Sequence, residues 1–127
     1  MRELSRAVRL RCPLCGEGGQ LKSWLRVKPH CDQCGLRFDR GEHDYFIGAY
    51  TLNLIVAELI VVVVFVAGIM ITYPEVPWNA LMWGLLPLAV IAPAATLPLA
   101  RSAWLAIDLS LRPAESSDYA FTRPPGR

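Results

Sequence analysis

The chain has 127 residues, of which 54% are apolar and only 19% are charged. An average soluble domain has about 25% charged residues, and two long charge-poor runs cannot both be buried in so short a chain. This composition therefore excludes a simple soluble globular domain. The net charge of +2 hides an asymmetry, because nine of the thirteen Lys and Arg residues precede residue 45 and none lies between Arg40 and Arg101.

Residues 1–45 form a basic head. Its first ten residues carry Arg2, Arg6 and Arg9 at helical spacing, which predicts a short basic helix near anionic lipid headgroups. No aromatic residue interleaves with these arginines, so we do not expect nucleic acid as a partner.

The head contains all four cysteines, in two C-x-x-C pairs that are each followed by glycine: Cys12, Cys15 and Gly16, then Cys31, Cys34 and Gly35. Two intervening residues let one tight turn direct both sulfurs at a single ion, and a glycine after the pair can take the left-handed conformation that completes the turn. Four thiolates are the ligand set of a structural zinc site with no open position for water. The pattern predicts structural zinc and no catalytic residue. Because so short a head has a small core, metal binding should supply most of its folding energy.

Three alternatives for the cysteines stay open. Two disulfides would need an oxidising compartment, a single C-x-x-C pair could carry redox chemistry, and iron could bind to the same four sulfurs. We favour a metal because the two pairs are symmetric, and because the topology predicted below places the thiols on the reducing side of a membrane. Among metals we favour zinc over iron, because zinc is the commoner ion in such sites.

Two apolar runs follow the head. Residues 46–73 contain no Lys, Arg, Pro or Asp, and residues 80–100 are uncharged. Each run is long enough to cross a bilayer core of about 30 Å as a helix, and residues 74–79 between them allow only a turn. Basic residues favour the cytoplasmic side, so both termini should be cytoplasmic. The predicted fold is a membrane α-helical hairpin of two transmembrane helices with a small N-terminal zinc-ribbon head.

The chain beyond Arg101 should continue as an amphipathic helix near the cytoplasmic surface. Asp108 and Arg112 have the i, i+4 spacing of a helical ion pair, with the acid first. The remaining residues are polar and rich in proline, which predicts disorder. The predicted units are the head at 1–45, the hairpin with its amphipathic extension at 46–111, and a disordered tail at 112–127.

Two polar side chains, Asn53 and Glu58, lie inside the first apolar run. An ionisable group at this depth is costly and indicates either a function or a helix contact. Three roles for Glu58 are open: a neutral hydrogen bond that joins the two helices, proton carriage or ion binding, and contact with another subunit.

Prolines in the second apolar run free backbone carbonyls that could accept hydrogen bonds from these side chains. Pro93 and Pro98 leave the carbonyls of Ala89 and Ala94 without their helical donors. A protonated Glu58 lies at the depth of the Ala89 carbonyl and can donate to it. The Asn53 amide can donate to the Ala94 carbonyl in the same way. One hairpin cannot easily present both side chains to the second helix. We therefore expect Asn53 to face that helix, and the carboxyl group to lie at an edge that another subunit or a partner helix covers.

The motifs in chain order are Cys12-Pro-Leu-Cys15-Gly16, Cys31-x-x-Cys34-Gly35-Leu36-x-Phe38, two spans and a closing Arg101. Over about residues 8–112 this pattern resembles the bacterial domain-of-unknown-function family DUF983. Its members are short membrane proteins with a zinc-ribbon-like head. Residues 41–49 depart from the Gly-Asp-Gly-Pro-Ala stretch that many members carry there. The resemblance implies the architecture above, a bacterial inner membrane, and an accessory role in the assembly of a respiratory membrane complex.

The predicted function is that of a non-enzymatic accessory protein whose zinc ribbon binds a membrane or cytoplasmic protein partner. Membrane lipid is a further expected partner, and a homo-oligomer is an alternative. Two other functions stay open: a small proton-coupled carrier subunit that uses Glu58, and a protein that handles metal or thiols through its four cysteines.

Overall fold

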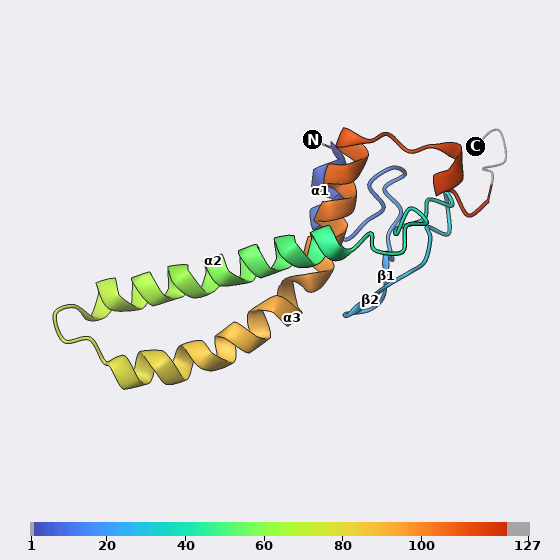
Figure 1. Cartoon of the computed structure of the whole chain (residues 1–127). Helices are drawn as coiled ribbons and strands as arrows, with labels where there is room; N and C mark the ends of the chain where they lie inside the picture. Colours follow the sequence, from blue (N-terminus) through green and yellow to red (C-terminus); the bar gives the residue numbers. More distant parts are fainter. Residues whose placement is uncertain (1, 122–127) are drawn as a thin grey trace.

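The computed structural model describes residues 2–121, which form a long helical hairpin joined to a small head (Figure 1). In chain order the elements are α1 (Arg2–Val8), β1 (Leu21–Ser23), β2 (Arg26–Val27), α2 (Ile47–Thr72), α3 (Trp78–Leu111) and a short 3-10 helix, η1 (Ser116–Asp118). The two strands pair antiparallel in the head.

The hairpin consists of α2, with 26 residues, and α3, with 34. At about 1.5 Å per residue they are about 39 and 51 Å long. Both are long and apolar enough to cross a membrane, as predicted. The predicted second span and its amphipathic extension are one continuous helix, and α3 bends where it reaches the head (Figure 1). The prolines inside α3 account for this bend, because each removes a helical hydrogen bond.

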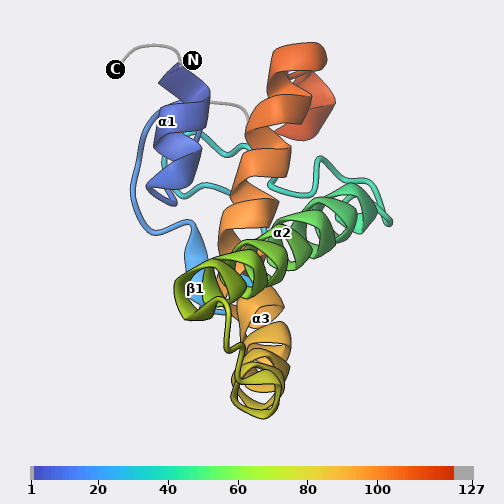
Figure 2. The same cartoon turned by 90° about the vertical axis from the view of Figure 1, so that its left-hand side faces the viewer.

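Small residues bring the two long helices together. The buried positions of α2 are Ala49, Asn53 and Ala57, and they face α3. A methyl group at Gly48 would overlap the Trp104 ring of α3. Small residues allow such close approach between membrane helices, and α2 crosses over α3 in the view along the hairpin (Figure 2).

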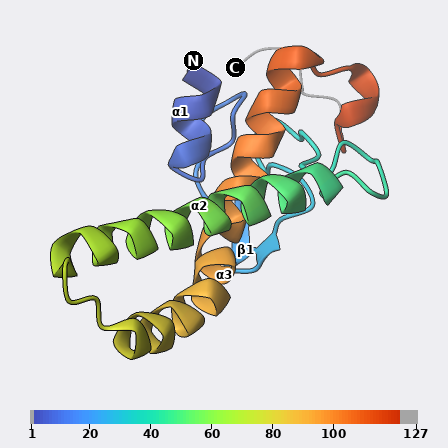
Figure 3. The same cartoon turned by 60° about the vertical axis from the view of Figure 1, so that its left-hand side comes forward.

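The head shares its core with the end of α3. Leu36 and Phe38 of the head are buried in one cluster with Leu105 and Leu109 of α3. The α1 helix packs beside the same last turns of α3 (Figure 3) and buries Ala7 completely. The apolar face of the amphipathic extension is therefore covered by the head, which explains how so short a head obtains a core.

The predicted disordered tail is wrong for residues 112–121. The backbone N–H of Arg37 donates to the Asp118 carbonyl at 2.7 Å, and the N–H of Ala120 donates to the Gly35 carbonyl at 2.7 Å. Tyr119 forms an antiparallel bridge with Leu36. Residues 118–120 thus extend the backbone hydrogen bonding of the second cysteine turn, and the head includes this segment as well as residues 2–45. The rest of the predicted tail, 122–127, lies outside the described residues.

Candidate metal centre and intramembrane polar site

Each cysteine pair is shaped by a tight turn that ends on glycine. Gly16 and Gly35 have φ angles of +81° and +75°, in the left-handed region that glycine adopts without strain. The N–H of Gly16 donates to the Cys12 carbonyl at 2.9 Å, and the N–H of Gly35 donates to the Cys31 carbonyl at 3.0 Å. The two turns repeat the same geometry, as the spacing predicted.

The two turns bring the four sulfurs together, within 4.8 Å of one another. The Sγ atoms of Cys12 and Cys34 are 3.7 Å apart, and those of Cys15 and Cys31 are 3.6 Å apart. A tetrahedron with zinc–sulfur bonds of about 2.3 Å has edges of about 3.8 Å, whereas a disulfide bond is about 2.05 Å long. All four cysteines are free thiols. The set fits a metal ion held by four thiolates, with no position left for water.

The surroundings of the sulfurs affect their charge. Burial raises the pKa of Cys34 to about 11 and raises the pKa of Cys12 further. Burial acts in the same direction on Cys31, but the backbone N–H groups of Cys34 and Gln33 bring its pKa below the ordinary value. The turns thus supply hydrogen bonds to thiolates, and a bound cation would favour the thiolate form at all four sulfurs.

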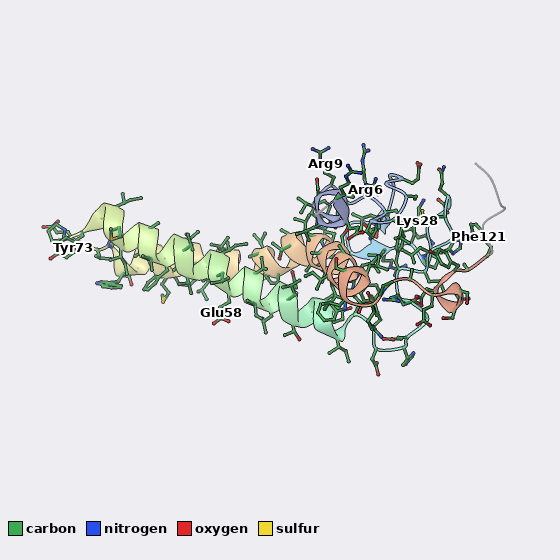
Figure 4. All side chains as sticks on the ribbon, turned by 90° about the horizontal axis from the view of Figure 1, so that it is seen from above. Arg6, Arg9, Lys28, Glu58, Tyr73 and Phe121 are labelled. Atoms are coloured by element: carbon green, nitrogen blue, oxygen red, sulfur yellow. The ribbon has the colours of Figure 1, made fainter. Side chains whose placement is uncertain are left out.

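The α1 helix supports the first turn. The Arg6 guanidinium donates to the carbonyls of Pro13 at 3.2 Å and Leu14 at 2.7 Å. Lipid was the partner expected for this helix, whereas its Arg6 holds the backbone of the first cysteine turn. Arg9 remains exposed at the outer side of the head (Figure 4).

A buried ion-pair network, which the sequence did not predict, joins head, α3 and tail. Arg40 donates to Asp108 and to Asp118, both at 2.7 Å, and its side chain is only 6% exposed. Tyr45 donates to Asp108 at 3.0 Å, and the predicted pair of Arg112 with Asp108 is present at 3.0 Å. Burial raises the pKa of Asp118, but the hydrogen bonds from Arg40 outweigh this and hold it below its ordinary value.

Asn53 faces the second long helix, as predicted. Its Nδ2 donates to the Pro93 carbonyl at 2.9 Å, and its Oδ1 accepts from the Thr96 hydroxyl at 2.7 Å. The expected acceptor, the Ala94 carbonyl, receives a different donor, the indole N–H of Trp24 at 3.1 Å. Trp24 is 57% exposed and lies outside the core cluster of the head.

Glu58 lies on the exposed side of α2 and projects sideways from the hairpin (Figure 4). No residue in the described part of the chain forms an ion pair or a side-chain hydrogen bond with it. Asn53 therefore makes a polar contact between the two helices, and the Glu58 carboxyl group is free for a contact outside the chain.

Fold and site together define a class: a helical hairpin that is apolar enough to cross a membrane, with a head that contains a cluster of four cysteines able to hold a metal ion. The profile of the family "Protein of unknown function (DUF983)" matches residues 21–108, and the chain belongs to this family. The matched segment contains the second cysteine pair and both polar residues of α2. No curated protein and no solved structure matches the chain.

Proposed function

We propose that this chain is a non-enzymatic accessory protein of the bacterial inner membrane that binds a protein partner through the Glu58 side of α2. It spans the membrane twice, keeps both termini in the cytoplasm and holds structural zinc at Cys12, Cys15, Cys31 and Cys34. The observation that carries the proposal is the exposed carboxyl group of Glu58, in the middle of an apolar helix.

The cost of leaving this carboxyl group in lipid supports a partner. Glu58 follows the start of α2 at Ile47 by eleven residues, which places it about 16 Å along the helix axis. An acidic side chain near the bilayer centre costs about 2.5–3.5 kcal/mol on insertion scales. Asn53, one and a half turns earlier, has its hydrogen bonds met within the chain. A partner helix with a hydrogen-bond donor at the depth of Glu58 would remove the cost of leaving its carboxyl group in lipid.

The charge distribution and the thiols support the topology. The labelled basic residues Arg6, Arg9 and Lys28 lie at the head, whereas Tyr73 marks the opposite end of the hairpin (Figure 4). Basic residues favour the cytoplasmic face, where thiols stay reduced and available to zinc. In this arrangement the ribbon is a rigid platform that presents a second surface to the same partner, and the family resemblance points to a component of a respiratory membrane complex during assembly.

The test is co-purification from native membranes in mild detergent. A partner should remain with the wild-type chain and with the Glu58→Gln variant, which keeps a hydrogen-bonding group, and should be lost with Glu58→Leu. Val90→Leu is the matched control, because Val90 is 73% exposed on α3. Retention of the partner by Glu58→Leu at the wild-type level would contradict the proposal.

Two measurements separate the other functions: the Glu58→Gln variant for proton carriage, and the rate of metal exchange for metal or thiol handling. Proton carriage requires an ionisable group, so it would be lost in Glu58→Gln although the partner is retained. A metal- or thiol-handling protein would exchange its ion rapidly with a chelator, whereas a closed four-thiolate site releases it slowly.

A further inference from the structure

A cationic cleft lies where the head meets the hairpin. It has a volume of about 420 Å³, and its polar lining comes from Lys22, Arg26 and Arg101, with Leu25 and Phe46 among its apolar walls. No acidic residue lines it. Within residues 2–121, none of the three basic side chains takes part in an ion pair. Three positive charges therefore converge without a counter-charge from the described chain.

Arg101 is held in a fixed orientation in this cleft. It donates to the Leu25 carbonyl at 2.6 Å and to the Tyr50 hydroxyl at 2.8 Å. Its Cζ lies 5.4 Å from the ring centroids of both Phe46 and Tyr50. Its Nε is buried and has no hydrogen-bond partner among the residues that the structure describes. All its partners are neutral, so they position the guanidinium and leave its charge available.

The cleft lies at the level expected for lipid headgroups. Arg101 directly follows the uncharged stretch of α3, and Ala94 precedes it by seven residues, about 10 Å nearer the membrane centre. The turn between β1 and β2 reaches this depth, because Trp24 donates to the Ala94 carbonyl. Trp24 and Leu25 at this turn are 57% and 54% exposed. Exposed apolar residues flanked by basic ones are typical of a segment at the membrane interface.

We infer that this cleft binds the phosphate group of an anionic phospholipid. Basic pockets between helices on the cytoplasmic side recognise such headgroups, and arginine offers phosphate charge-assisted hydrogen bonds. Lys22 and Arg26 supply further positive charge, while Leu25 and Phe46 contact the apolar part of the lipid. The bound lipid holds the β1–β2 turn, and with it the head, against the bilayer. This inference rests on the membrane placement proposed above.

The test uses the full-length chain, stripped of lipid in detergent and titrated with dioleoyl phosphatidylglycerol or dioleoyl phosphatidylcholine. Native mass spectrometry counts the bound lipids. The Lys22→Gln/Arg26→Gln variant should bind phosphatidylglycerol about 30-fold more weakly, because each basic residue near an anionic lipid surface contributes about a factor of five. Phosphatidylcholine carries no net charge, so its binding to this variant should change by less than about twofold.

The matched control is Arg11→Gln/Arg37→Gln, which removes the same charge from two exposed positions outside the cleft. It should bind both lipids as the wild type does. Equal weakening by both double variants would overturn the site, and displacement of the lipid by equimolar inorganic phosphate would overturn its assignment to a lipid. Flotation with liposomes reads the membrane placement separately, because a chain that does not insert fails to float with either lipid.

Discussion

Replacing Asp118 by Asn should open the head, although this residue lies in a segment expected to be disordered. The Asp118 carboxylate accepts from Arg40 Nε at 3.2 Å, from Arg40 Nη2 at 2.7 Å and from the Glu115 backbone N–H at 2.8 Å. Its side chain is 9% exposed. The substitution removes one negative charge from a buried network and leaves Arg40 with a single carboxylate partner, Asp108.

Removing one member of a buried ion pair costs about 3–5 kcal/mol. We expect a value near the lower end, about 3 kcal/mol, because Asp108 still neutralises Arg40. This corresponds to an equilibrium constant for opening of the head that is about a hundredfold larger than in the wild type. The pKa of Asp118 lies below its ordinary value in the folded chain, so its contribution is complete above the unfolded pKa of about 3.9 and is lost as the pH falls through the lower folded value. A comparison at pH 7 therefore measures the full effect.

The assay is the rate of thiol alkylation of the metal-loaded protein in detergent, because all four cysteines lie in the head. When closing is faster than alkylation, this rate follows the population of the open state. Glu42→Gln is the control, since its pair with Arg112 is 3.2 Å long and about half exposed on both sides, and such pairs contribute about 0–1 kcal/mol. Alkylation of Asp118→Asn at the rate of Glu42→Gln would refute the reasoning.

Three further outcomes follow from packing and hydrogen bonding. Truncation after Pro113 should accelerate metal loss to a chelator, because it removes the segment paired with the second cysteine turn; unchanged loss would show that this pairing is dispensable. Asn53→Ala should destabilise the hairpin by about 0.6–1.7 kcal/mol in thermal unfolding, whereas Glu58→Ala should not lower stability; the reverse order would contradict the assignment of the interhelical contact. Gly48→Ala should lower the free energy of unfolding by about 1–3 kcal/mol, because the added methyl group overlaps the Trp104 ring of α3. Gly84→Ala, whose methyl group meets nothing within 4 Å, should leave the thermal unfolding midpoint unchanged or raise it.

The features that the sequence predicted correctly are those with a local signal. The first apolar run, 46–73, became a helix over Ile47–Thr72, because length and hydropathy suffice for such an element. The spacing of the cysteines and the glycine after each pair predicted the cluster and the left-handed turns. Asn53 faces α3 as expected, although it donates to the Pro93 carbonyl and not to the Ala94 carbonyl that Pro98 frees.

The features that it did not predict depend on contacts between distant parts of the chain. Arg40 and Asp118 are 78 residues apart, and neither has a periodic pattern around it that would indicate its partner. The Ala94 carbonyl, freed by Pro98, accepts from Trp24 of the β1–β2 turn, and these two residues are 70 positions apart. The tail is polar in composition, yet its backbone pairs with the second cysteine turn. Composition alone cannot predict such backbone pairing.

The most direct test of the central claim is cross-linking in native membranes from a photoreactive benzoylphenylalanine at position 62. Val62 is 48% exposed and lies one turn after Glu58 on α2, so the Glu58 carboxyl group is retained. The account predicts one discrete protein adduct at this position and none at position 90 on the exposed side of α3. An adduct of twice the chain's mass would assign the partner as a second copy. Only lipid adducts at position 62, as at position 90, would contradict a partner helix at the Glu58 carboxyl group.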